Sequence, residues 1–180
     1  PLKKGTFIEN TLEILDGVSD EIIISFRDEK QLVLFDEYIR GRDTVVDVLR
    51  NAGPLAGMLE GLKAASSEYV FVVACDMPYL NREVIELLFG MSEGHDAVIP
   101  VNSSGQKEPL HAVYRRMPML AAIEDSIREG NRSVMSPISM LDDVLFLEGE
   151  EITKVDNDLL TFTNINTPGD VDALKRDCIR

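Results

Sequence analysis

The sequence predicts an α/β protein with a mostly parallel sheet and helices on both faces. Short runs of β-branched and aromatic residues alternate with amphipathic segments along nearly the whole chain. Such alternation is typical of a parallel sheet whose crossovers are helices. The 180 residues suit one compact domain, and 44% of them are hydrophobic, which is enough for a sizeable core.

The first half of the chain alternates regularly between the two patterns. Apolar residues recur at helical spacing in its first segment, and Pro54 fits the first turn of a later helix. The β-branched runs EIIISF and DTVVDV are typical of strands. The expected elements are a helix over 7–15, a strand over 21–26, a helix over 29–38, a strand over 43–48 and a helix over 53–65.

The second half continues the alternation. Asn81 can cap a helix that begins at the next residue, and Gly130 can close the helix of MPMLAAIEDSIREG. The apolar run YVFVVAC is typical of a strand buried on both faces. The expected elements are strands over 69–75, 96–101, 109–116, 143–148 and 160–166, and helices over 82–89, 117–130 and 168–178.

The charge and the cysteine content narrow the class of protein. A net charge of −14 disfavours binding to nucleic-acid backbones or anionic membranes, and no apolar run approaches the ~20 residues that cross a bilayer. Two widely separated cysteines favour a reducing compartment, so we expect a cytoplasmic protein. An anionic small molecule stays possible if a metal ion or local basic groups offset the charge.

Asp76 interrupts the pattern, because this acid directly follows the apolar run of 69–75. Parallel sheets bind ligands at the carboxyl ends of their strands. A carboxylate there can bind a hard cation such as Mg²⁺, or it can cap the turn before the helix that starts after Asn81. Position alone does not separate the two interpretations.

Four motifs then occur in order: GPLAGMLEGL over 53–62, VACDMPYL over 73–80, KEPLHAVYRR over 107–116 and TNINTPGDVDAL over 163–174. Together they resemble the nucleotidyltransferases of the molybdenum cofactor guanylyltransferase (MobA) type. The resemblance implies a Rossmann-like three-layer fold. It also implies Mg²⁺-dependent transfer of GMP from GTP to molybdopterin, with release of pyrophosphate. The alternatives are CTP or another phosphorylated acceptor, or a non-catalytic relative that binds a nucleotide or a partner protein.

The resemblance also implies roles for individual residues. Asp76 is implied as the catalytic metal ligand, with Asn166 near the same metal. Glycines at 53 and 57 would let backbone amides approach a ligand, although the motif taken alone favours a tight strand-to-helix connection. The implied nucleotide-binding residues are Ser25 (where the family often has Asn), Asp47, Gly53, Pro54, Leu55, Gly57 and Asp76, and the implied acceptor-binding residues are His111, Arg132, Asn164 and Asn166.

Three of these residues also have ordinary structural interpretations. A lone His near apolar residues is more often part of a core, so His111 has a structural alternative. Arg132 can be a surface cation, and Asn166 can be a turn residue before Thr167 and Pro168.

The family begins with a strand and a Gly-rich phosphate loop that ends in a lysine. PLKKGTFIENTLEIL aligns with the segment directly after that lysine. We therefore expect 1–180 to be a single nucleotidyltransferase domain whose first strand and phosphate loop lie upstream of Pro1. That strand lies mid-sheet in the family. The oligomeric state is left open between a monomer and a small homo-oligomer.

Overall fold

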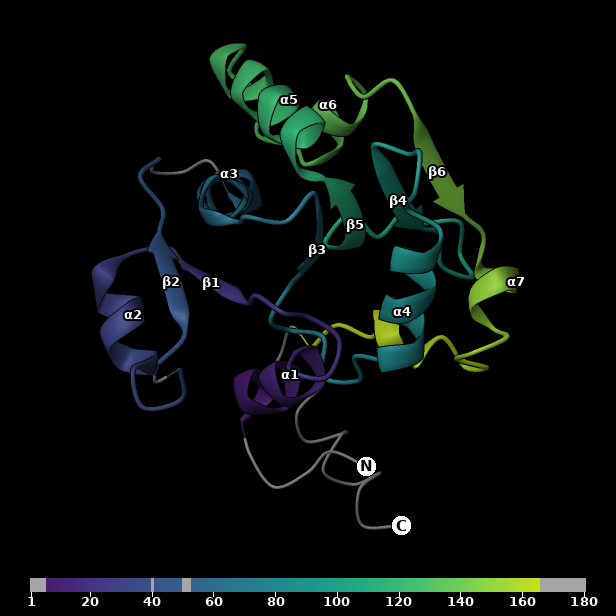
Figure 1. The fold of residues 1–180 in the computed structure, drawn as a ribbon, viewed down its shortest axis with the longest axis horizontal. Coiled ribbons are helices and arrows are strands. Elements are labelled where there is room, and N and C mark those ends of the chain that lie inside the picture. The colour runs from purple at the N-terminus through teal and green to yellow at the C-terminus, as the bar shows by residue number, and fades with distance from the viewer. Residues whose placement is uncertain (1–5, 40, 50–52, 166–180) are drawn as a thin grey trace.

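The computed structural model describes residues 6–39, 41–49 and 53–165 (Figure 1). Strands and helices alternate as the sequence predicts. The elements in chain order are α1 (Phe7–Leu15), β1 (Ile23–Phe26), α2 (Glu29–Phe35), β2 (Asp43–Val46), α3 (Pro54–Ala64), β3 (Tyr69–Val73), α4 (Arg82–Gly90), β4 (Ala97–Pro100), β5 (His111–Arg115), α5 (Arg116–Arg128), α6 (Met135–Ile138), β6 (Val144–Leu147), α7 (Gly149–Ile152) and a 3₁₀ helix (Leu160–Phe162).

Local capping chemistry sets several of these bounds. Thr6 and Glu9 form a capping box at the start of α1. The Asn81 side chain accepts the Glu83 N–H at 2.9 Å and so starts α4 as predicted. Gly130 has a φ of 82°, a left-handed conformation that suits glycine directly after α5. These caps explain why the sequence located these helix ends well.

The described strands form two sheets. β1 and β2 pair in parallel, and the second sheet has the order β3-β5-β4-β6. In that sheet β5 is antiparallel to β3 and β4, whereas β4 and β6 are parallel. β5 follows β4 through a loop without a helix, which is why it alone reverses direction. The fold is therefore the mostly parallel α/β class that the sequence predicts.

Helices cover both faces of the four-stranded sheet (Figure 1). Neighbouring residues of one strand point to opposite faces, since Ile99 packs with α3 and α5 while Val98 packs with α4. A third cluster joins Leu12 of α1 to Phe26 of β1. Among the described residues, no helix is long and apolar enough to span a bilayer.

One predicted strand, over 160–166, is a 3₁₀ turn in the part of this segment that the structure describes. Leu159 adopts a left-handed conformation with a φ of 51°, and the Thr161 N–H donates to the Asp156 carboxylate at 2.9 Å. These local bonds occupy the groups that a strand would use. The short helices α6 and α7 were not predicted, and the predicted helix over 168–178 lies outside the described residues.

Both faces of the strand predicted over 69–75 are covered, since Val70 and Val72 pack against one core cluster and Tyr69 and Phe71 against the other, but the strand is less deeply buried than expected. All five residues of β3 are only partly buried, and Cys75 beyond it is exposed. The fully buried strand is β4. Among the described strands, β3 pairs with β5 alone and β1 with β2 alone, so each has one edge without a strand partner.

Candidate nucleotide and metal site

Asp76 lies three residues beyond the end of β3, at the carboxyl end of that strand. Its Oδ1 atom is buried and accepts no hydrogen bond from any described residue. Buried polar atoms are nearly always paired, because an unpaired one carries a desolvation penalty of about 1–3 kcal/mol. Because no described residue pairs with this oxygen, a bound cation is a suitable partner for it, and carboxylate oxygens are ligands that Mg²⁺ prefers.

The capping alternative for Asp76 finds no support in this structure. The helix that follows is capped by the Asn81 side chain instead. Asp76 Oδ1 has no hydrogen-bond partner among the described residues, so this oxygen caps no described turn. Of the two interpretations left open by the sequence, cation binding fits the contacts better.

The segment before residue 166 lies directly beside Asp76. The Ile165 N–H donates to the Asp76 carbonyl oxygen at 2.9 Å, which brings the exposed Asn164 next to the same loop. Asn166 lies outside the described residues. Within the described ranges no three His, Cys, Asp or Glu side chains cluster as a metal site. A cation here would therefore depend on few protein ligands, as Mg²⁺ does when substrate phosphates and waters complete its coordination.

A second group forms where β1 and β2 meet α3. The Ser25 hydroxyl donates to Asp47 Oδ1 at 2.9 Å. Burial raises the pKa of Asp47, the Ser25 hydrogen bond lowers it, and the charge of Glu60 raises it. No described residue donates to the other carboxylate oxygen of Asp47, which leaves that atom able to accept from a ligand.

Gly57 packs directly against this pair. A Cβ at Gly57 would lie 2.9 Å from Ser25 Oγ and 3.6 Å from Asp47 Oδ1. The missing side chain thus makes room for the Ser25–Asp47 hydrogen bond. This packing role differs from the expected close approach of the Gly57 backbone to a ligand.

The start of α3 has the backbone geometry expected from the sequence. Gly53 has a φ of 59° and caps the helix without a side-chain hydrogen bond, and Pro54 occupies the first turn. Leu55 has no exposed surface, so its side chain belongs to the core and only its backbone could meet a nucleotide.

The expectation that His111 faces the acceptor is corrected, because His111 has no exposed surface. Its Nδ1 lies 3.3 Å from Met77 Sδ, and its Nε2 lies 3.3 Å from Thr161 Oγ1. Arg132, by contrast, is exposed in the α5–α6 connection and forms no ion pair with a described residue. Arg132 thus stays a candidate for binding an anion.

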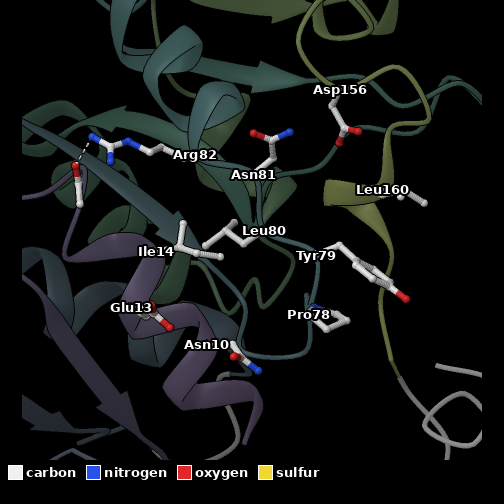
Figure 2. Close-up of a pocket in the computed structure, with 11 residues that line it drawn as sticks. Asn10, Glu13, Ile14, Pro78, Tyr79, Leu80, Asn81, Arg82, Asp156 and Leu160 are labelled. Atoms are coloured by element: carbon white, nitrogen blue, oxygen red, sulfur yellow. Dashed lines mark hydrogen bonds between the residues drawn. The ribbon is translucent and has the colours of Figure 1, made fainter. Parts of the chain in front are cut away.

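A pocket of about 490 Å³ lies on the α1 side of the loop that follows Asp76 (Figure 2). Its charged lining groups are Glu13, Arg82 and Asp156. The Arg82 guanidinium already bonds Glu86 and the Gly17 carbonyl oxygen. Two carboxylates and one engaged cation do not suit a phosphorylated ligand, so we do not assign the substrates to this pocket.

The structure thus assembles two groups, one around Asp76 and one around Asp47. Among the described residues no hydrogen bond or ion pair joins the two groups. The sequence did not indicate Met77 and Thr161, the two contacts of the His111 ring. Thr161 is 50 residues away in the chain, and no spacing signal links it to His111.

A mostly parallel sheet between two helix layers, with a free carboxylate oxygen just beyond a strand, is typical of Rossmann-like nucleotide-binding proteins. Comparisons with known proteins narrow this class. Residues 1–144 match the family model of the MobA-like NTP transferase domain. The chain belongs to this family and is therefore a nucleotidyltransferase.

Two relatives come from species of Methanosarcina. A protein of Methanosarcina mazei named probable molybdenum cofactor guanylyltransferase is 42% identical over 177 residues, covering 96% of this chain and 79% of that protein. A protein of the same name from Methanosarcina acetivorans is 42% identical over 175 residues, covering 94% of this chain and 77% of that protein.

Solved structures agree with this result. The crystal structure of molybdopterin-guanine dinucleotide biosynthesis protein A from Archaeoglobus fulgidus matches with a TM-score of 0.80 and 30% identity, over 96% of this chain and 85% of that one. A 2-C-methyl-D-erythritol 4-phosphate cytidylyltransferase from Thermus thermophilus matches with a TM-score of 0.67 and 18% identity, over 98% of this chain and 92% of that one. This second likeness concerns the fold alone.

Proposed function

We propose that this protein transfers GMP from GTP to molybdopterin, releases pyrophosphate and depends on Mg²⁺. The observation that carries the proposal is the buried, unpaired Oδ1 of Asp76 beside the carboxyl end of β3. The names of the relatives from Methanosarcina and Archaeoglobus support the choice of nucleotide and acceptor. A cytoplasmic location fits these small-molecule substrates.

In the proposed reaction an oxygen of the acceptor's phosphate attacks the α-phosphorus of GTP. A new P–O bond forms, the bond to the β-phosphate oxygen breaks, and pyrophosphate leaves with that electron pair. Such a reaction needs alignment and charge neutralisation more than a covalent nucleophile. A bound Mg²⁺ supplies part of that neutralisation, and Asp76 is the residue that would hold it, with Asn166 proposed near the same metal.

The Ser25, Asp47 and Gly57 group is proposed to bind the nucleoside, with the backbone at 53–55. One Asp47 oxygen is occupied by Ser25, and the other can accept from N–H or O–H donors of the nucleoside. Guanine offers N–H donors to that open oxygen. Cytosine offers one amino group, so CTP is the second candidate nucleotide.

The acceptor is proposed to lie on the side of Asn164 and Arg132. Asn164 follows the 3₁₀ turn and is exposed beside the Asp76 loop. Arg132 is exposed and forms no ion pair with a described residue, and a guanidinium can bind a phosphate through two N–H donors at once.

We also propose that a further strand and a phosphate-binding loop precede residue 1 in the complete enzyme. The two sheets support this proposal, because β1 and β3 each have one edge without a partner among the described strands. A Gly-rich turn that leads into a helix would supply N–H donors to the triphosphate. The second candidate function, a non-catalytic nucleotide- or partner-binding protein, applies if that loop does not exist.

Pyrophosphate release with GTP or CTP, Mg²⁺ and molybdopterin tests the proposal. We expect release with GTP that requires both Mg²⁺ and the acceptor. Nucleotide binding in calorimetry without any release, in a protein that carries the upstream loop, would favour the non-catalytic alternative. Faster release with CTP would overturn the choice of nucleotide alone.

A further inference from the structure

The buried imidazole of His111 lies directly behind the loop that carries Asp76. The ring extends from β5 and contacts Met77, the residue after Asp76, and Thr161 of the 3₁₀ helix. Phe71 and Phe162 contact its faces and edges, with ring centroids 5.2 and 5.1 Å away in T-shaped geometry. No solvent reaches this ring, so its contacts are all within the protein.

The chemistry of the neighbours fixes which nitrogen carries the proton. A thioether sulfur can only accept, so the tautomer protonated at Nδ1 is the one that uses both contacts, with Nδ1 donating to Met77 Sδ, 3.3 Å away. Burial lowers the pKa of His111 to about 3, and the ring is therefore neutral with Nε2 as an acceptor. The Thr161 hydroxyl, 3.3 Å from Nε2, then donates to it.

Thr161 extends this chain of hydrogen bonds to the far end of the loop. Its Oγ1 accepts the Asn81 N–H at 3.2 Å. One imidazole thus holds the loop over 76–81 at both ends, through Met77 directly and through Asn81 by way of Thr161. The Ile165 N–H on the Asp76 carbonyl oxygen adds a third attachment to the same segment.

We propose that His111 is a positioning residue for the Asp76 carboxylate. It touches neither substrate nor cation, and it sets the place of the loop from which Oδ1 projects. The inference rests on the proposed function only for the identity of the cation that Asp76 binds. The hydrogen bonds that hold the loop over 76–81 do not depend on that function. Groups that hydrogen-bond a metal ligand directly change metal affinity by about 10–100-fold when altered, and we expect His111, which acts through Met77 and Thr161, to lie at the lower end of that range.

Two substitutions on β5 separate positioning from packing. His111→Phe keeps an aromatic ring against Phe71 and Phe162 but removes both nitrogens. Tyr114→Phe is the matched control, because it removes another hydrogen bond of β5, from Tyr114 Oη to the Pro109 carbonyl oxygen at 2.7 Å. No hydrogen bond of Tyr114 reaches the loop over 76–81.

Hydrogen exchange followed by NMR measures how well the loop over 76–81 is held in place, and it needs no activity assay. In His111→Phe we expect the amides of Asn81 and Ile165 to exchange about tenfold faster relative to the Val98 amide of β4. In Tyr114→Phe we expect all three amides to change together. Equal changes in both variants, or no selective change in His111→Phe, would overturn the inference.

Titration with Mn²⁺ alone, followed by its electron spin resonance signal, connects the loop to the cation. We expect His111→Phe to bind Mn²⁺ about tenfold more weakly than Tyr114→Phe does. Unchanged Mn²⁺ affinity with a loosened loop would contradict the positioning of Asp76. The positioning role of His111 would stand, and the proposed function would fail, if His111→Phe weakens Mn²⁺ binding as expected but the wild-type protein releases no pyrophosphate.

Discussion

The Ser25 hydroxyl donates a hydrogen bond to Asp47 across two parallel strands, at 2.9 Å, and Gly57 closes over this pair from α3. The Ser25 hydroxyl proton is therefore engaged with the Asp47 carboxylate and is not free to bind a nucleotide. The other Asp47 carboxylate oxygen accepts from no described residue and stays open to a ligand.

Replacing Gly57 by Ala should weaken nucleotide binding. The new Cβ would lie 2.9 Å from Ser25 Oγ, so the hydroxyl must rotate away and lose its bond to Asp47. We expect GTP affinity in calorimetry to fall by about 1 kcal/mol, the worth of one such bond. Gly61→Ala is the control on the same helix, because nothing lies within 4 Å of its Cβ position. It should keep GTP affinity and raise stability by about 0.5–1 kcal/mol; equal GTP affinity in both variants would contradict the packing argument.

Replacing Arg132 by Ala should weaken use of the phosphorylated acceptor and leave nucleotide binding nearly unchanged. Loss of one charge-assisted contact is worth roughly 1.5–3 kcal/mol. Acceptor-dependent kinetics beside GTP titration would measure the two separately. Arg128→Ala is the control, since the Arg128 guanidinium is exposed and already bonds Asp125 at 2.6 Å. Equal losses for both ligands would show that Arg132 lies on the wrong side.

The stability of the protein should fall in acid because of His111. The pKa of this residue is about 3 in the fold and about 6.5 in an unfolded chain. Between these values the unfolded state binds more protons, so the stabilisation is complete above pH 6.5 and is lost as the pH falls toward 3.

Urea unfolding of the wild type and His111→Phe across this range measures the effect. We expect the wild type to lose up to about 1.4 kcal/mol per pH unit more than the variant, because all other titrating groups are shared. Tyr114→Phe should keep the wild-type slope. Parallel curves for the wild type and His111→Phe would mean that the buried ring does not titrate as described.

Adding the proposed strand and phosphate loop ahead of position 1 should raise both stability and activity. A strand placed against β1 or β3 would cover sheet edges that have no partner among the described strands. The family resemblance implies a Gly-rich turn within ~15–20 added residues, and its N–H groups would bind the triphosphate. These donors matter because the triphosphate carries about four negative charges and the protein has a net charge of −14. Thermal melts and pyrophosphate release of both lengths would measure this. Full activity of residues 1–180 alone would contradict the proposal.

The sequence predicted the fold well where local signals agree with tertiary packing. Asn81 starts a helix and Gly130 ends one, because capping and left-handed backbone are set by neighbouring residues. The burial of β3 was overestimated, because it depends on a strand partner and not on composition. The strand expected over 160–166 was not found in its described part, because Asp156 draws the Thr161 N–H into a turn.

The site could be predicted only in part. Asp76 stood out because an acid directly follows an apolar run, where it can bind a cation or cap a turn. The lack of a partner for its Oδ1 among the described residues favours the first interpretation. His111 was placed on the wrong side, since its burial depends on Met77 and on Thr161, which lies 50 residues away. Contacts of this kind leave no periodic signal in the chain.

Asp76→Asn tests the central claim most directly, in a protein that carries its upstream loop. We expect the thermal midpoint to stay equal or rise, since the substitution removes a buried, unpaired charged oxygen. The rate of Mg²⁺-dependent GMP transfer from α-labelled GTP to molybdopterin should fall by about 10²-fold or more. Asp142→Asn, at an exposed site, should transfer at the wild-type rate. A folded Asp76→Asn protein with the wild-type rate would contradict the account.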